Sequence, residues 1–341
     1  MNTVLTIIVA LLIFGVLIIS HEFGHFIAAK KSGVDVIEFS VGMGPLIYQK
    51  KKKETDYSIR LLPIGGYCKM KGEDDEGDDI YEDGSLFAAP AWKRVIIMAA
   101  GAINNFIIAI IIFFIIYCMI GTDASTTIGA FSDISPAYEA GMEIGDTIVS
   151  INGGAIKEWD DITSYIREGD GSTLTIVIKS ASGETKTFTV SPYYEETEGV
   201  YLIGIHPAAK TNVWHAFIDA IKMTGIMIAE IWGIFVGLFR GQVGMEAFSG
   251  PIGATVVIGQ YLHAGLVYLL SIAGSISVSL GFFNLLPIPA LDGSHILFTL
   301  VEWIHGKPIN RKVENRIHLV GFALLLVLAI VIAYKDIVNL F

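Results

Sequence analysis

The stretch LIISHEFGHFIAAKK, residues 17–31, places two histidines and a glutamate inside an apolar run that extends from about Val4 to Ala29. A run of this length is long enough to cross a lipid bilayer as a helix. Ionisable side chains inside such a helix cost several kcal/mol unless they are paired or bind a metal, so they mark functional sites by default. The stretch therefore predicts a spanning helix that carries chemistry.

The residues at its centre, His21, Glu22 and His25, form the arrangement H-E-x-x-H. Because four residues make about one helical turn, both imidazoles project from one face and can take adjacent corners of a zinc tetrahedron. Zinc lowers the pKa of bound water toward about 7, and a nearby carboxylate can take the proton and pass it to a leaving amine. This pattern predicts peptide hydrolysis, with Glu22 as the base and both histidines as zinc ligands.

An alternative interpretation places the same residues at a helix end. Lys30 and Lys31 mark a boundary of the apolar run, so His21 and His25 could cap the helix at the membrane interface, with Glu22 in water. A bare match to a short motif is moderate evidence, and the apolar residues on both sides favour the metal site.

A second acid lies between apolar runs much later, in FFNLLPIPALDGSHILF, residues 282–298. Two histidines need a third protein ligand, and Asp292 is the best candidate because two prolines break the helix before it. Asn284 can donate a hydrogen bond to the scissile carbonyl or its oxyanion. His295 is the rival ligand, and it ranks below Asp292 because a position on the helix surface or behind the ligands suits it better.

The whole chain has the composition of a membrane protein. Of its 341 residues 53% are hydrophobic and 17% charged, and the mean hydropathy is +0.60, well above that of a soluble globular domain. The net charge of -11 and the lack of a basic motif argue against a nucleic-acid partner.

Apolar runs predict four spanning helices. They cover about residues 4–29, 95–120, 265–286 and 322–333, the last extended on both sides. The segment 213–239 is long enough to be a fifth, but its charges lie mainly in its first half, which favours a helix at the membrane interface.

Basic residues predict the orientation. The region 30–94 holds eleven Lys and Arg and the loop 302–316 four, whereas 121–212 holds five against fourteen acids. The positive-inside rule makes the first two regions cytoplasmic and the third extracytoplasmic. The protein is therefore expected in the cell membrane, and its metal site inside the bilayer near the cytoplasmic face.

Two parts of the chain have β character. Region 121–212 contains β-type runs with Gly and Asp turns and one helical stretch, which predicts a separate small domain; the runs are 126–131, 146–151, 174–179 and 186–190, and the helix lies near 160–167. Two apolar runs around a Lys-rich turn, flanked by Gly42, Gly44, Gly65 and Gly66, predict a hairpin that adjoins the membrane. The acidic run 72–84 is interpreted as a solvated linker, with a metal site as the minor alternative because its residues lack the spacing of a calcium loop.

Several segments together resemble a known family. They are HEFGH (21–25), GMGP (42–45), RLLPIGGYCKM (60–70), PAYEAGMEIGDTIVSINGGAI (136–156) and NLLPIPALDG (284–293). In this order they are similar to the site-2 protease family of intramembrane zinc metalloproteases, and especially to its bacterial members with a PDZ domain, which act in regulated intramembrane proteolysis. The resemblance covers nearly the whole chain.

The resemblance implies roles for individual residues. Zinc is the implied cofactor, His21, His25 and Asp292 its ligands, Glu22 the base, and Asn284 a contact of the substrate or transition state. The hairpin is implied to dip toward the active site, where an unfolded substrate helix would add as a strand. The candidate substrate contacts are Gly42, Gly44, Gly65, Gly66 and Asn104. Asn104 belongs to GAINNF, residues 101–106, where the family more often has proline at the position of Ala102.

The fold class expected from these features is a mainly α-helical polytopic membrane protein with about four transmembrane helices. A membrane-associated β-hairpin and one inserted extracytoplasmic α+β PDZ domain complete it, although longer family members carry two PDZ domains. The expected boundaries are 1–33 (first helix), 34–72 (hairpin), 73–92 (acidic linker), 93–121 (second helix), 122–207 (PDZ domain), 208–245 (interfacial helix), 246–301 (third spanning region), 302–316 (basic loop) and 317–341 (fourth helix).

The expected partners are the lipid bilayer, single-span membrane proteins as substrates, and a peptide or C-terminus at the PDZ domain, unless that domain only excludes bulky substrates. By resemblance, the substrates are anti-sigma factors or remnant signal peptides. A non-catalytic scaffold that binds through its PDZ domain is the alternative, but it has no use for Glu22 or Asp292. A metal transporter would carry more intramembrane ligands than this chain does.

Overall fold

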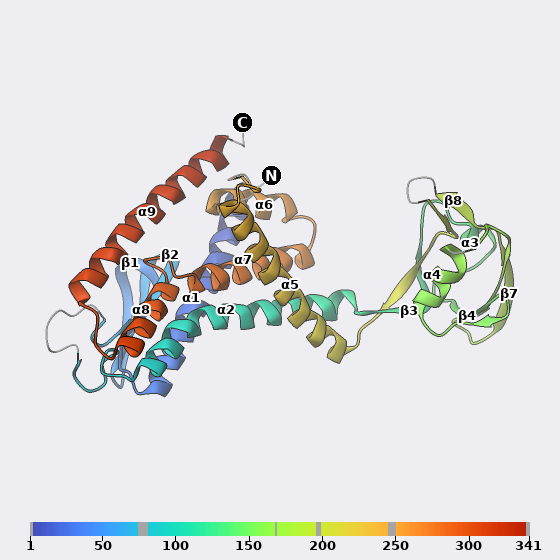
Figure 1. The fold of residues 1–341 in the computed structure, drawn as a ribbon. Coiled ribbons are helices and arrows are strands. Elements are labelled where there is room, and N and C mark those ends of the chain that lie inside the picture. Colours follow the sequence, from blue (N-terminus) through green and yellow to red (C-terminus); the bar gives the residue numbers. More distant parts are fainter. Residues whose placement is uncertain (1–2, 74–80, 168, 196–198, 245–249, 339–341) are drawn as a thin grey trace. The chain divides into compact units, whose positions relative to one another are not determined.

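The computed structural model describes residues 3–73, 81–167, 169–195, 199–244 and 250–338 (Figure 1). The chain divides into two compact units. Unit 1 comprises residues 1–116 and 220–341, and unit 2 is Tyr117–Asp219. Most of the sequence-predicted site residues belong to the helices and the hairpin of unit 1, so this unit is considered first.

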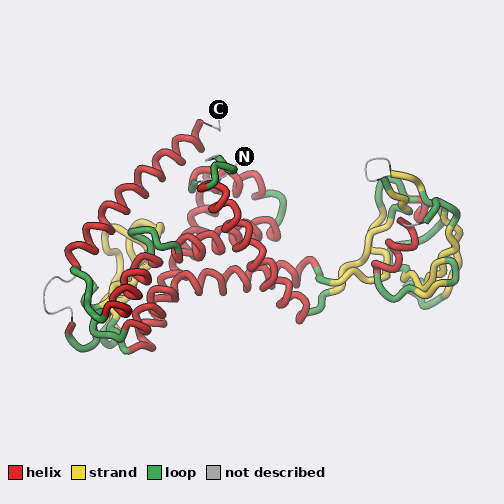
Figure 2. The backbone as a smooth tube through the Cα atoms, in the orientation of Figure 1, coloured by secondary structure: helices red, strands yellow, loops and turns green. Residues whose placement is uncertain are grey.

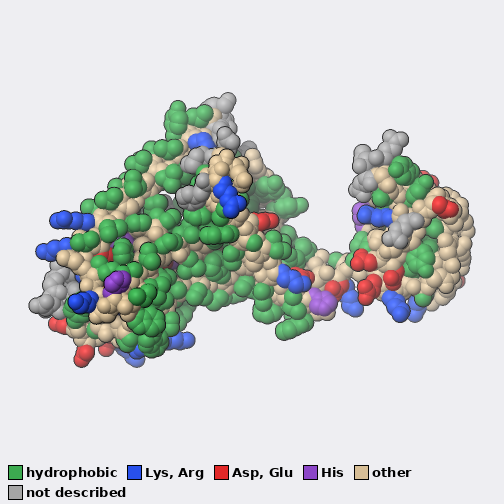
Figure 3. All heavy atoms as spheres, in the orientation of Figure 1, with side chains coloured by type: hydrophobic (Ala, Val, Ile, Leu, Met, Phe, Trp, Pro, Cys, Tyr) green, Lys and Arg blue, Asp and Glu red, His purple; other side chains and the backbone are tan. Residues whose placement is uncertain are grey.

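Long helices make up most of unit 1. In chain order they are α1 (Thr3–Ser32), α2 (Ala91–Ile120), α5 (Val213–Phe239), α6 (Pro251–Tyr261), α7 (Leu266–Leu285), α8 (Asp292–His305) and α9 (Arg311–Val338), where α2 and α5 continue into unit 2. Apolar side chains cover much of the face of unit 1 in Figure 3. Leu324 and Ile330 on α9, for example, are 66% and 61% exposed, which suits contact with lipid rather than water.

Within the described residues, five helices are long and apolar enough to cross a membrane: α1, α2, α5, α7 and α9. The predicted count of four is therefore not confirmed, and α5 is the additional candidate. The length and composition of α5 suit a spanning helix. Its predicted position at the membrane interface stays a prediction.

Some predicted boundaries differ from the structure. The described residues of region 246–301, the predicted third spanning region, contain one helix able to span a membrane, α7, together with α6 and most of α8. The predicted basic loop 302–316 is shorter, because α8 extends to His305 and α9 already begins at Arg311. Gly306 ends α8 with a φ of 68°, and the side chain of Asn310 caps α9 by accepting the N–H of Lys312 at 3.0 Å. Part of the acidic linker, residues 74–80, lies outside the described residues.

The hairpin of unit 1 consists of β1 (Val36–Lys52) and β2 (Thr55–Met70), the strands drawn beside the helices of this unit in Figure 2. Residues 36–41 of β1 pair with residues 66–70 of β2, and residues 38–41 also pair with residues 56–59. Both strands therefore bend back on themselves. Gly42, Gly44 and Gly65 allow these bends, because each has a φ between 84° and 87° that other residues rarely adopt.

The helices around the site approach one another at small residues. Gly24 of α1 faces the backbone of Ala100 on α2, and a Cβ on Gly281 of α7 would lie 2.9 Å from the carbonyl oxygen of Ala102 on α2. Close contact at glycines is a common way for membrane helices to pack. As a result, α1 packs against Ala100 and α7 against Ala102, the two residues that flank Gly101 on α2.

Unit 2 is a small α+β domain. Its elements are β3 (Asp123–Phe131), α3 (Pro136–Glu139), β4 (Thr147–Ile151), β5 (Gly154–Ala155), α4 (Trp159–Arg167), β6 (Leu174–Lys179), β7 (Thr185–Val190), β8 (Tyr193–Glu195), β9 (Val200–Leu202) and β10 (Ile205–Lys210). The main sheet has the order β10-β3-β4-β6-β7, with β5 paired to β4. The predicted runs fall on β3, β4, β6 and β7, and the predicted helix on α4. Alternate burial along β6 places Ile176 and Ile178 in the core.

Candidate metal centre

Three potential ligand atoms from α1 and α8 meet in unit 1. Nε2 of His21 and Nε2 of His25 lie 3.2 Å apart, and Oδ2 of Asp292 lies 3.0 Å from the first and 3.2 Å from the second. The histidines are neighbours because they lie one turn apart on α1. Asp292 reaches them because α7 ends at Leu285 and the chain turns before α8 begins.

Hydrogen bonds on the far side of each ring orient both imidazoles. Nδ1 of His25 donates to the backbone oxygen of Ile97 on α2 at 2.8 Å, so its Nε2 is free to face the centre. The side-chain amide of Asn105, also on α2, lies 3.4 Å from Nδ1 of His21. The amide oxygen of Asn105 is buried and has no hydrogen-bond partner within the described part of the chain, so turning the amide lets it accept the Nδ1 proton of His21. Such outer contacts are typical of histidines that bind metals.

The arrangement fits zinc. Oδ2 of Asp292 is buried and, among the residues that the structure describes, accepts no hydrogen bond, although two ring nitrogens lie close to it. Lone pairs that face one another at such distances repel unless a cation lies among them. Ligand atoms of a tetrahedral zinc with bonds of about 2.0–2.1 Å are about 3.3 Å apart, close to the observed triangle. Two histidines and one carboxylate also leave the fourth position open, as in catalytic zinc sites.

Glu22 lies beside this triangle without belonging to it. Its Oε2 accepts the backbone N–H of Cys68 on β2 at 3.1 Å. A Cβ on Gly66 would lie 3.7 Å from Cγ of Glu22, so β2 passes closely over the carboxylate. Burial and the charge of Glu22 raise the pKa of the Cys68 thiol far above its usual range, and this thiol is not one of the three ligand groups that meet at the centre.

Gly101 on α2 provides the space for the two rings. A Cβ there would overlap Nε2 of His25 and would lie 2.7 and 2.8 Å from Cε1 and Nε2 of His21. Gly101 and Asn105 were not among the candidate site residues. The signal for them was in the sequence, because residues four apart on a helix share one face, and GAINNF places both at that spacing.

The other sequence-predicted residues lie around the centre. Asn284 is half-buried in the last turn of α7, and among the described residues nothing forms a hydrogen bond with its amide. Nδ2 of Asn104 donates to the backbone oxygen of Ser20 at 2.5 Å and to its hydroxyl at 2.8 Å, so Asn104 joins α2 to α1. Its role in substrate binding stays a prediction, as do those of the four hairpin glycines. His295 is not in the triangle; its Nδ1 faces Glu314 at 3.6 Å.

Comparison with known proteins agrees with this geometry. A profile of Peptidase family M50 matches residues 9–328. The chain belongs to Peptidase family M50, the site-2 protease family. The family predicted from the sequence is thereby confirmed, and with it the class of enzyme.

Relatives of this M50 peptidase match it over nearly its whole length. A chain of Clostridium acetobutylicum assigned to the zinc metalloproteases is 38% identical over 97% of both chains. The zinc metalloprotease RasP of Bacillus licheniformis is 32% identical over 100% of both chains. The regulator of sigma-W protease RasP of Bacillus subtilis is 30% identical over 98% of this chain and 99% of its own.

One solved structure relates to a part of this M50 peptidase. The PDZ domain of an SdrC-like protein of Listeria monocytogenes is 24% identical and covers 24% of this chain and 85% of its own, with a TM-score of 0.22. This score is too low to show a shared fold, so the PDZ fold of unit 2 stays a prediction.

Proposed function

We propose that this chain is an intramembrane zinc endopeptidase that hydrolyses peptide bonds within the transmembrane segments of single-span membrane proteins. The observation that carries the proposal is the triangle formed by the buried His21 and His25 with the half-buried Asp292, with Glu22 beside it. Both histidines lie in α1, one of the helices able to cross a membrane. Titratable residues inside a membrane-spanning helix are expected to have a function, here catalysis.

The protein supplies separate groups for each task. His21, His25 and Asp292 would hold zinc, which when bound would supply Lewis-acid activation of water at neutral pH. Glu22 accepts the proton of the attacking water and delivers it to the leaving amine. The free amide of Asn284 donates a hydrogen bond to the scissile carbonyl or its oxyanion.

The substrate reaches these groups as an extended strand. A peptide bond in a helix is shielded by the hydrogen bonds of the helix, so a protease must first extend the chain. Segment 66–70 of β2 passes over Glu22, and a substrate strand that pairs with this hairpin is held next to the catalytic groups. In this arrangement Gly42, Gly44, Gly65 and Gly66 keep the hairpin narrow where the substrate enters.

The location and partners follow the same proposal. The metal centre lies near the cytoplasmic face of the cell membrane and unit 2 outside the cytoplasm in this proposal, which the distribution of Lys and Arg along the sequence supports. The Bacillus subtilis relative is named a regulator of sigma-W protease, which supports substrates of a sigma-factor pathway, such as membrane-bound anti-sigma factors. Remnant signal peptides are a second substrate class, which only the family resemblance implies.

Unit 2 would contribute recognition as a PDZ domain. It has a cavity of about 240 Å³ between α4 and residues 202–207, lined by apolar side chains such as Trp159 and Ile162. A groove between a helix and a strand suits a peptide or a C-terminus.

A Glu22→Gln variant tests the proposed function. The variant and the wild type are reconstituted in membranes with a model single-span substrate, and cleavage and bound zinc are measured together. Loss of cleavage with zinc retained is expected, because Glu22 moves the proton and does not bind the metal. An Asp292→Ala variant is expected to lose zinc. Undiminished cleavage by Glu22→Gln would show that the proposed mechanism is wrong.

A further inference from the structure

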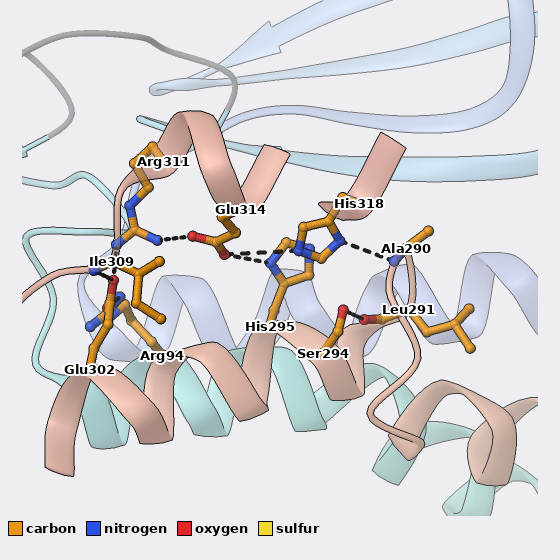
Figure 4. A network of polar contacts seen from close by, with 10 residues as sticks. All are labelled: Arg94, Ala290, Leu291, Ser294, His295, Glu302, Ile309, Arg311, Glu314 and His318. Atoms are coloured by element: carbon orange, nitrogen blue, oxygen red, sulfur yellow. Dashed lines mark hydrogen bonds and ion pairs between the residues drawn. The ribbon is translucent and has the colours of Figure 1, made fainter. Parts of the chain in front are cut away.

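The loop that presents Asp292 has one hydrogen bond that anchors it to another helix. In residues 287–291 the two prolines have no N–H, and the N–H groups of Ile288 and Leu291 donate to oxygens of residues 286 and 288. The remaining donor, the N–H of Ala290, donates to Nδ1 of His318 on α9 at 3.0 Å (Figure 4). This bond connects the loop to α9 and gives the half-buried N–H of Ala290 its hydrogen-bond partner.

The backbone at Ala290 makes this anchor important. Its φ of 77° lies in the left-handed region, which is unfavourable for a residue with a Cβ. Such conformations persist only where surrounding contacts hold them. Ala290 precedes Asp292 by two residues, so a change in its backbone would move the carboxylate of Asp292.

A second contact joins α9 to the same loop one turn later. A Cβ on Gly321 would lie 2.7 Å from the backbone oxygen of Pro289 and would also overlap its Cβ. The backbone of α9 therefore packs directly on the loop. Together, His318 and Gly321 hold residues 289 and 290 from one face of α9.

His318, His295 and Glu314 resemble a second metal site, but the hydrogen bond argues against one. The three side chains offer ligand atoms within 4.8 Å of one another. Because Nδ1 of His318 accepts the N–H of Ala290, the proton of the neutral ring is on Nε2, which then cannot bind a metal. Nε2 instead points toward Oε1 of Glu314 at 3.9 Å.

Neighbouring side chains hold His318 in this orientation. Its ring stacks on that of His295, with 4.1 Å between the centroids and 14° between the planes. Glu314 is buried, and its other oxygen accepts a hydrogen bond from Arg311 at 2.5 Å. Arg311 also donates to Glu302 at 2.7 Å, and Glu302 accepts from Arg94 of α2 at 2.7 Å (Figure 4). This network ties α9 to α8 and α2.

We propose that His318 is a positioning residue of the metal centre, which holds the strained loop at Ala290 so that Asp292 meets the two histidines. The proposal rests on the proposed function, because it takes zinc to be the group that Asp292 binds. It makes α9 a part of the metal site although α9 carries no ligand. His318 acts on Asp292 through the backbone, as residues that support a metal ligand from behind do.

Zinc affinity of the purified full chain tests the proposal. It is measured by competition with a chromophoric chelator, together with the visible spectrum of the Co²⁺-substituted protein. His318→Leu is expected to weaken zinc binding about 10-fold and to change the Co²⁺ spectrum. His318→Asn is expected to bind zinc nearly as the wild type does, because its Oδ1 can replace Nδ1 as the acceptor. His305→Leu, on the exposed end of α8, is the control and should change neither quantity.

The outcomes separate this inference from the proposed function. Wild-type zinc affinity and spectrum in His318→Leu would overturn the inference, and so would equal losses in His318→Leu and His318→Asn. If His318→Leu does not fold, Gly321→Ala is used instead, because its added Cβ displaces the loop without altering the polar network. Wild-type zinc affinity in Gly321→Ala would then overturn the inference. Asp292→Ala tests the metal site itself, since wild-type affinity in that variant would contradict the proposed function.

Discussion

Replacing Gly101 by alanine should weaken zinc binding strongly without unfolding the protein. Gly101 lies within α2, on the face that contacts the rings of His21 and His25. The substitution adds one methyl group and no charge. The substitution should lower zinc affinity but raise the helix propensity of this position. The two effects can therefore be measured separately.

The size of the effect follows from the available space. The new Cβ would lie 2.7 Å from Cε1 of His21 and closer to Nε2 of His25. Carbon atoms in contact are normally about 3.5–4.0 Å apart, so the rings must move by about 0.8 Å or more. Metal–ligand distances tolerate only about 0.2 Å, so we expect zinc affinity to fall at least about 100-fold. Alanine is about 1 kcal/mol better than glycine inside a helix, which offsets part of the about 1–3 kcal/mol that crowding of the rings costs, so the metal-free protein should remain folded.

Zinc affinity and the thermal unfolding of metal-free protein are the two measurements. Gly225→Ala is the matched control, because it makes the same change inside α5, where a Cβ would have no neighbour within 4 Å. This control should bind zinc as the wild type does. Wild-type zinc affinity in Gly101→Ala would refute the assignment of the metal to this face of α2.

Three further variants test other parts of the fold. Burial alone would raise the pKa of Glu38, but hydrogen bonds from a serine hydroxyl and from Arg60 lower the pKa below its usual value. The ionised carboxylate therefore stabilises the hairpin above about pH 4.5, and this stabilisation should be lost as the pH falls. Hydrogen exchange of the hairpin should lose that acid dependence in Glu38→Gln, and an unchanged profile would contradict the assignment. Asp336→Ala removes the acceptor of two N–H groups at the start of α6, including that of Gly250 at 3.0 Å, and should speed exchange in α6 by destabilising it by about 1–2 kcal/mol. Ile176→Ala should destabilise unit 2 by about 2–5 kcal/mol and leave zinc affinity unchanged; a parallel loss of zinc would show that unit 2 supports the metal centre.

Much of the fold could be predicted because its signals are local. Apolar runs mark α1, α2, α7 and α9, since a bilayer imposes one minimum length on every span. Alternating burial and turn residues similarly mark the strands of unit 2. Whether α5 spans the membrane was harder to predict, because its length suits both a spanning helix and an interfacial helix. The helix α9 begins at Arg311 and not at residue 317 as predicted, because the cap from Asn310, which hydropathy does not report, sets its start.

The candidate site was predictable where the spacing of a motif corresponds to one helical turn. His21, Glu22 and His25 meet this condition, and Asp292 stood out as an acid between apolar runs. Asn105 was missed in favour of Asn104 because the choice depends on which face of α2 packs on α1. A difference of one residue rotates a side chain by about 100°, and hydropathy in an apolar helix does not report that rotation.

The amino-acid sequence already carries the ligand types, the base and the class of protein, since these depend on residue chemistry and on spacing along one helix. The assembly of the centre depends on contacts between distant segments. Asp292 joins His21 and His25 across some 270 residues, Gly101 leaves room for the rings, and His318 anchors the loop at Ala290. Packing of α1, α2, α8 and α9 determines these contacts, because each is made by side chains or backbone groups that are far apart in the chain.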